Sequence, residues 1–85
     1  MKLKPRIVEV KVPLLTGEES LMTIKRWLVA IGEPVEIDQD LVELDIDDTE
    51  SFSLPSPLDG KLIAIQAEPD EIVEPGQVLA LIEAD

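Results

Sequence analysis

The sequence predicts an all-β domain, a flattened barrel or two-sheet sandwich of roughly eight short strands with approximate two-fold symmetry. Three observations lead to this prediction: segments that alternate between apolar and polar residues, turn residues between them, and an internal repeat. The 85 residues form one expected domain, residues 1–85, and its core depends on Val, Ile and Leu because the chain has only one Trp and one Phe.

Alternation of period two predicts strands, because successive side chains of a strand point to opposite faces of a sheet. Clusters of proline, glycine and acidic residues separate the alternating segments and predict turns. The predicted strands are residues 7–12, 41–46, 51–54, 61–65 and 78–82, and the predicted turns are residues 13–17, 32–34, 47–50, 55–60 and 68–76.

The stretch from residue 18 to residue 31 allows two interpretations. Its acidic start and the spacing of its apolar residues are typical of an amphipathic helix. Residues 22–29 would instead form a strand in a small barrel, which suits Trp27 and its β-branched neighbours. Periodicity alone does not separate the two interpretations.

An internal repeat favours the strand. It relates the two halves of the chain at a constant offset of 38 positions, as from Gly32 to Asp70. The same offset pairs Ile24 with Leu62, so residues 22–29 correspond to the predicted strand 61–65. Each half alone would leave an apolar face uncovered, and packing the two faces together gives the symmetric barrel or sandwich. The matched positions are Gly32, Glu33, Val35, Asp38 and Leu41 in the first half and Asp70, Glu71, Val73, Gly76 and Leu79 in the second.

Charge and composition exclude several classes of function. A net charge of −12 would repel nucleic acid and anionic membranes, and the absence of cysteine and histidine removes thiolate chemistry and the usual general base. The basic start, Met1 to Arg6, is not followed by a long apolar run, so neither a signal peptide nor a membrane span is expected. We therefore expect a cytoplasmic protein with no nucleic-acid or membrane partner. Its acidity suits docking on basic surfaces of larger proteins, although a solvated exterior is the commoner reason for such acidity.

Several motifs lie in order along nearly the whole chain. They are Val12-Pro13, Ile24-Lys25-Arg26-Trp27, Gly32-Glu33-Pro34-Val35, Leu41-Val42-Glu43-Leu44-Asp45 and Leu54-Pro55-Ser56-Pro57-Leu58-Asp59-Gly60. Each is weak alone, but together they resemble the lipoyl/biotinyl domain family, the carrier domains of 2-oxo acid dehydrogenase acyltransferases and biotin-dependent carboxylases. The resemblance implies a barrel-sandwich hybrid of two four-stranded antiparallel sheets. Two positions depart from the family pattern, since Leu21-Met22 replaces its Glu-Gly pair and Asp70 replaces a turn glycine.

The hairpin that carries the cofactor in lipoyl domains differs most. In that family a tip lysine bears lipoate through an amide bond, whereas here the tip reads Asp47-Asp48-Thr49-Glu50. Counting back from Pro55 puts Thr49 at the lysine position, and counting forward from Leu41 puts Asp48 there. Neither residue can form the amide, and the biotin-type Met-Lys-Met is also absent. We therefore expect no cofactor, although lipoate would be the cofactor of a functional carrier.

The resemblance and the missing lysine together imply a degenerate, unlipoylated module with an interaction or structural role and no enzymatic activity. If docking survives, the expected partner is a protein with a basic surface, such as a 2-oxo acid dehydrogenase component, and the candidate docking residues are Asp45, Glu43 and Lys61. The alternative is a genuine swinging-arm acyl carrier domain with an altered attachment site. The amines nearest to the tip in sequence, Lys25 and Lys61, are not at the tip in the family pattern.

An acidic cluster surrounds the hairpin tip: Glu43, Asp45, Asp47, Asp48 and Glu50. Such carboxylates can hold calcium or magnesium, but their spacing lacks the calcium-loop pattern. Acid-base catalysis by paired carboxylates needs a sheltered pocket, which a hairpin tip in water does not provide. We therefore predict neither a metal site nor a catalytic site. For Trp27 we predict packing in the small core rather than an anchor for a partner.

Overall fold

The computed structural model describes residues 6–13, 21–47 and 50–85, and these residues form eight β-strands. No helix within these ranges is long and apolar enough to cross a membrane. The strands are β1 (Ile7–Lys11), β2 (Met22–Trp27), β3 (Pro34–Val35), β4 (Asp40–Ile46), β5 (Glu50–Pro55), β6 (Gly60–Ile65), β7 (Ile72–Val73) and β8 (Val78–Ala84).

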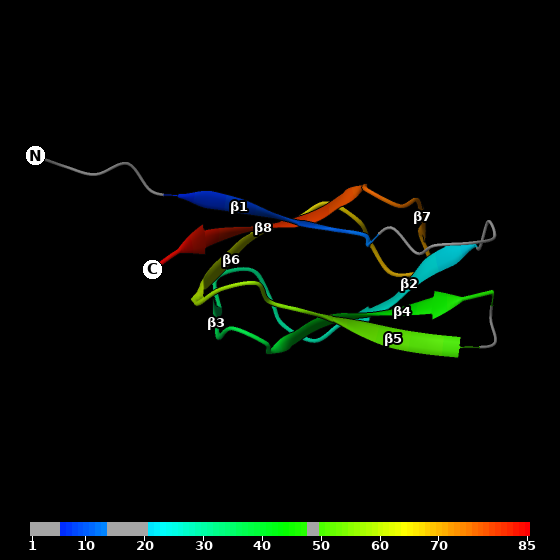
Figure 1. Cartoon of the computed structure of the whole chain (residues 1–85), viewed down its shortest axis with the longest axis horizontal. Coiled ribbons are helices and arrows are strands. Elements are labelled where there is room, and N and C mark those ends of the chain that lie inside the picture. The colour runs from blue at the N-terminus through cyan, green and yellow to red at the C-terminus, as the bar shows by residue number, and fades with distance from the viewer. Residues whose placement is uncertain (1–5, 14–20, 48–49) are drawn as a thin grey trace, which may run out of the picture.

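The strands form two antiparallel four-stranded sheets that face each other (Figure 1). One sheet has the order β1-β8-β6-β3 and the other has the order β5-β4-β2-β7. The β4–β5 hairpin lies at one end of the sandwich, and the C-terminal end of β8 lies at the opposite end (Figure 1). The predicted fold class is therefore confirmed.

The internal repeat is an accurate structural symmetry. Adding 38 to the bounds of β2, β3 and β4 gives the bounds of β6, β7 and β8. The backbone hydrogen bonds between these segments repeat as well: Gly32 N donates to Leu62 O at 2.7 Å, and Asp70 N donates to Ile24 O at 2.8 Å. The chain thus crosses from one sheet to the other in the same way in both halves, and the strand interpretation of residues 22–29 is confirmed for Met22–Trp27.

Left-handed backbone conformations occur at equivalent turn positions in the two halves. Gly32 (φ 95°) corresponds to Asp70 (φ 71°), and Asp38 (φ 69°) corresponds to Gly76 (φ 84°). Each half therefore has one glycine and one aspartate at these two turns, in opposite order. Aspartate tolerates a positive φ better than most residues, which explains why Asp70 can replace the expected glycine.

Two apolar clusters fill the space between the sheets, and Trp27 packs against both of them. Its indole Nε1 donates a hydrogen bond to the backbone oxygen of Ala67 at 2.8 Å, so the polar atom of this large side chain is satisfied. Trp27 therefore has the packing role predicted for it. The largest fully buried side chains are Met22, Ile24, Leu41, Leu44, Leu62, Leu79 and Ile82.

The sequence-based prediction missed two strands, and its other strand bounds differ from the structure by one or two residues. Residues 32–34 and 68–76 were expected to be turns, but they overlap or contain β3 (Pro34–Val35) and β7 (Ile72–Val73). Each of these strands has two residues and pairs on one side only, with β6 and β2 respectively. Two residues are too few to show an alternating pattern, so proline and acidic neighbours dominated the prediction.

Candidate functional site

The hairpin between β4 and β5 is the part of the fold where the sequence analysis placed the candidate site. Ile46 and Glu50 form the last pair of the β4–β5 ladder, so residues 47–49 connect the strands. Of the four predicted tip residues, Asp47 and Glu50 are described and both are exposed, whereas Asp48 and Thr49 lie outside the described residues.

Asp47 joins the hairpin to the segment that enters β2. Its backbone N donates to Leu21 O at 2.9 Å, and its carboxylate Oδ1 accepts a hydrogen bond from Leu21 N at 2.9 Å. Asp47 has a φ of 50°, a conformation that aspartate adopts more readily than most residues. The start of the tip is therefore held against the neighbouring strand by its own side chain and backbone.

The described lysines all lie away from the hairpin tip. Lys25 is exposed at the irregularity of β2 between Ile24 and Arg26, and Lys61 is exposed on β6 in the other sheet. Lys11 lies on β1 and forms an ion pair with Glu9. Residues 47–50 themselves carry carboxylates and a hydroxyl but no primary amine, so they do not fit a group attached through a lysine amide.

The outer face of the β5-β4-β2-β7 sheet beside the hairpin carries a row of four directly paired residues. Ile72 on β7 pairs with Thr23, Thr23 pairs with Asp45, and Asp45 pairs with Ser51. Their chain neighbours Met22, Ile24, Leu44 and Val73 are buried, so alternation directs the four side chains away from the core. Leu21 and Asp47 continue this surface toward the tip. We call Leu21, Thr23, Asp45, Asp47, Ser51 and Ile72 the hairpin face.

The two other candidate docking residues lie outside the hairpin face. Glu43 forms an ion pair with Arg26 of β2, so its charge is already balanced by a neighbour. Lys61 lies in the other sheet, where it pairs with Pro34 and with Glu83, close to the C-terminus of the chain. The structure therefore does not bring Lys61 together with Asp45, and only Asp45 belongs to the hairpin face.

Charge on the hairpin face is negative and uncompensated. Among the described residues, neither Asp45 nor Asp47 nor Glu50 takes part in an ion pair. The described residues also contain no group of three or more acidic, histidine or cysteine side chains arranged to hold a metal ion. The carboxylates at this end are thus available to cations on another molecule.

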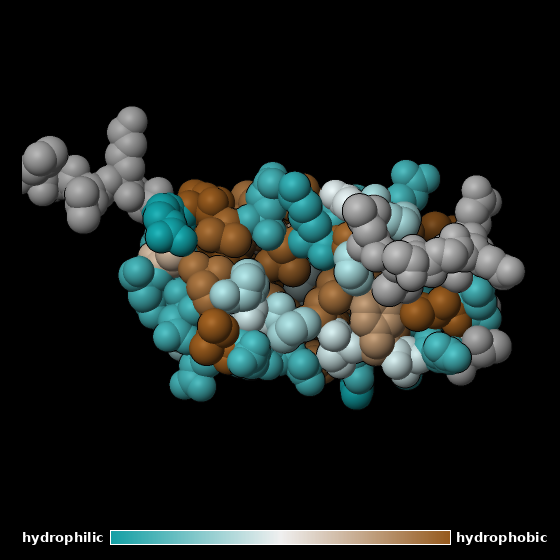
Figure 2. All heavy atoms as spheres, in the orientation of Figure 1, coloured by the Kyte–Doolittle hydropathy of each residue, from teal (hydrophilic) through white to brown (hydrophobic). Residues whose placement is uncertain are grey.

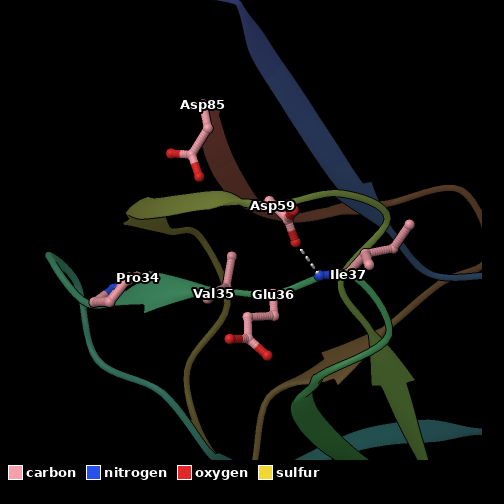
Figure 3. A pocket seen from close by; sticks show the side chains of 6 residues that line it. All are labelled: Pro34, Val35, Glu36, Ile37, Asp59 and Asp85. Carbon is pink, nitrogen blue, oxygen red and sulfur yellow. Dashed lines mark hydrogen bonds between the residues drawn. The ribbon is translucent and has the colours of Figure 1, made fainter.

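The opposite end of the sandwich contains a shallow depression of about 470 Å³. Its lining residues are Pro34, Val35, Glu36, Ile37, Asp59 and Asp85 (Figure 3). Ile37 N donates to Asp59 Oδ1 at 2.8 Å (Figure 3), which fixes the β3–β4 turn against the segment before β6. By the 38-residue symmetry, Asp59 and Asp85 are equivalent to Leu21 and Asp47, so this end has the same backbone arrangement as the hairpin end but different side chains.

Sequence reasoning missed Thr23 and Ser51 of the hairpin face, and it also missed the apolar pair Leu21 and Ile72. Both are large apolar side chains on the surface, with exposed fractions of 53% and 58%. Leu21 did leave a signal, because it occupies a position where the related motif has glutamate. Ile72 left none, because its two-residue strand was expected to be part of a turn.

Comparisons with known proteins agree with the fold. The biotin/lipoyl family model, described as "Biotin-requiring enzyme", matches residues 8–82. The chain is 37% identical over 73 residues to the dihydrolipoyllysine-residue acetyltransferase component of the pyruvate dehydrogenase complex of Corynebacterium glutamicum, covering 86% of this chain and 11% of that protein. It is 38% identical over 76 residues to the dihydrolipoyllysine-residue succinyltransferase component of the 2-oxoglutarate dehydrogenase complex of Bartonella vinsonii, covering 89% of this chain and 18% of that protein. The chain thus spans less than a fifth of the length of either relative.

Proposed function

The chain belongs to the biotin/lipoyl domain family, and on this basis we propose that it is a docking module of a 2-oxo acid dehydrogenase complex whose hairpin carries no lipoyl group. Domains of this family are non-catalytic, in agreement with the expectation that the chain is not an enzyme. Its similarity to acyltransferase components of two such complexes supports the choice of complex.

The observation that carries the proposal is the chemistry of the hairpin. An amide-linked arm requires a primary amine at the tip, and residues 47–50 offer only carboxylates and a hydroxyl. Replacing a lysine by these residues also makes this end of the molecule more acidic. What remains of the family's carrier site is therefore a two-stranded hairpin with a negative surface, which suits binding rather than group transfer.

The proposed partner surface is basic. Asp45, Asp47 and Glu50 have no ion-pair partner among the described residues, and the whole chain has a net charge of −12. Such a surface accelerates encounter with a positively charged partner and makes the association sensitive to salt. The partner of this chemistry that we propose is the dehydrogenase component of the complex.

The experiment measures binding of the purified chain to the 2-oxo acid dehydrogenases of its own organism at several salt concentrations. We expect the affinity to fall as salt rises, and Asp45→Asn combined with Glu50→Gln to weaken binding further. Glu83→Gln combined with Asp85→Asn is the matched control, because it removes the same two charges at the opposite end, where Glu83 is the symmetry equivalent of Asp45. An affinity that stays constant over a wide range of salt, or an equal effect of the control, would contradict the proposal.

The alternative function is a swinging-arm carrier whose cofactor is attached elsewhere. Two observations on Lys25 support this alternative: its side chain is exposed, and its strand, β2, belongs to the same sheet as the hairpin. Peptide mapping of the chain from its native cells separates the two functions, since the carrier requires an added group on a specific residue.

A further inference from the structure

Two exposed apolar side chains distinguish the hairpin face from an ordinary acidic surface. Leu21 and Ile72 are 53% and 58% exposed, and both lie on the outer side of the β5-β4-β2-β7 sheet beside Asp45 and Asp47. Ile72 pairs directly with Thr23, which is two residues from Leu21. Side chains at such diagonal positions lie about 7–8 Å apart, near enough for one partner residue to contact both. Apolar atoms reach the surface along the whole visible face of the molecule, this end included (Figure 2).

The internal symmetry provides a built-in comparison for this pair. At the opposite end, the positions equivalent to Leu21 and Ile72 are Asp59 and Pro34. The position equivalent to Thr23 is Lys61, which lies beside Glu83. The strand pairing at these positions is the same at both ends, so this pairing does not require leucine and isoleucine at the hairpin end.

We propose that Leu21 and Ile72 form the apolar centre of the docking surface, and that the partner inserts an apolar side chain flanked by lysine or arginine residues. This inference rests on the proposed function and names the chemistry of its partner. Buried apolar contacts at the centre of an interface supply most of its affinity, and charges at its rim mainly affect encounter and specificity. The hairpin face has this arrangement, because Leu21 lies beside Asp47 and only Thr23 separates Ile72 from Asp45 across the sheet.

A second copy of this chain does not fit the same surface. A symmetric dimer through the hairpin face would bring the acidic patch of one copy against the same patch of the other. Like charges in contact oppose association, and each copy has a net charge of −12. A partner with positive charge around an apolar residue satisfies both the carboxylates and the apolar pair.

The test compares a double variant, which carries both Leu21→Ser and Ile72→Ser, with the single variant Ile37→Ser. Ile37 is the matched control, because it is 57% exposed but lies at the opposite end of the sandwich. The binding partners are the purified pyruvate and 2-oxoglutarate dehydrogenases of the organism that makes the chain. We expect the double variant to bind at least about tenfold more weakly, with an unchanged dependence on salt and an unchanged unfolding midpoint, and the control to bind as the wild type does.

The outcomes separate the inference from the function on which it rests. Equal affinity of the double variant and the wild type would overturn the inference and leave acidic docking in place. An equal loss in the Ile37→Ser control would also overturn it, because the effect would then not belong to the hairpin face. Absence of binding by the wild type at low salt would overturn both. Sedimentation of the free chain as a dimer that the double variant abolishes would replace the partner by a second copy.

Discussion

Asp47 makes two hydrogen bonds to Leu21, one through its backbone N and one through its carboxylate, each 2.9 Å long. These bonds connect the start of the hairpin tip to the chain that enters β2, 26 residues away in sequence. They also fix the backbone of Leu21 so that its side chain remains on the hairpin face. The acidic and the apolar parts of the proposed docking surface are therefore positioned by one contact.

Asp47→Ala should loosen this contact, whereas Asp47→Asn should preserve it. Alanine removes the acceptor for Leu21 N and adopts a positive φ less readily, so we expect the free energy of unfolding to fall by about 1 kcal/mol. Asparagine keeps an acceptor oxygen and tolerates this conformation. Urea unfolding measures the stability, and hydrogen exchange of the Leu21 amide measures the local effect. Equal behaviour of the two variants would show that the side-chain bond contributes nothing.

Restoring an amine to the tip should restore modification. We expect a lipoate ligase to add a lipoyl group to Asp48→Lys, and to a smaller extent to Thr49→Lys, because residue 48 is by sequence the middle of the three residues between the paired Ile46 and Glu50. The unchanged chain is the control and should gain no mass. Labelling of the unchanged chain, or of neither variant, would contradict this account of the hairpin.

Gly60 and Gly76 should respond differently to alanine. A Cβ at Gly60 would overlap the backbone oxygen of Glu83 on the neighbouring strand, so Gly60→Ala should lower the free energy of unfolding by about 2 kcal/mol or more. A Cβ at Gly76 meets nothing within 4 Å, and only its positive φ of 84° is unfavourable, which predicts a loss of about 1 kcal/mol.

Gly76→Asn is the control for the backbone effect at that turn. Its symmetry equivalent, Asp38, has a φ of 69°, so a short polar side chain is compatible with the turn. We expect Gly76→Asn to lose less stability than Gly76→Ala in chemical unfolding. The reverse order would mean that the two halves of the barrel are not equivalent at this position.

Trp27→Phe should destabilise the barrel by about 1–2 kcal/mol, because Ala67 O then loses its donor in a partly buried place. The chain has one tryptophan, so unfolding of this variant must be followed by circular dichroism rather than by tryptophan fluorescence. An unchanged stability would mean that water replaces the indole nitrogen without loss. In that case the contribution of Trp27 to stability would come from its apolar packing alone.

Much of the fold could be predicted because the repeat in the sequence is a repeat in space. Residues 22–27 have ambiguous periodicity, but their equivalents at 60–65 do not, and the offset of 38 resolves the ambiguity. The strands that were missed, β3 and β7, have two residues each and pair on one side only. These strands form only by pairing with β6 and β2, and the local sequence pattern does not show such long-range pairing.

The candidate site was predictable only where it depends on sequence chemistry. The missing amine is visible in Asp47-Asp48-Thr49-Glu50 without any structure. The sequence does not show which acidic side chains are free to bind a partner. Glu43 forms an ion pair with Arg26, which lies 17 residues earlier in the chain. The apolar pair depends on the register of two strands, since Ile72 reaches the hairpin face only through its pairing with Thr23. Lys61 was grouped with Asp45 as a docking residue, yet the two lie on different sheets.

The central claim is that the hairpin carries no lipoyl group, and the mass of the intact chain purified from its native cells tests it most directly. We predict a mass equal to that of the bare sequence, with every lysine-containing peptide unmodified. A lipoyl- or biotinyl-sized addition would contradict the claim. Its mapped position would then identify the residue that takes the place of the tip lysine.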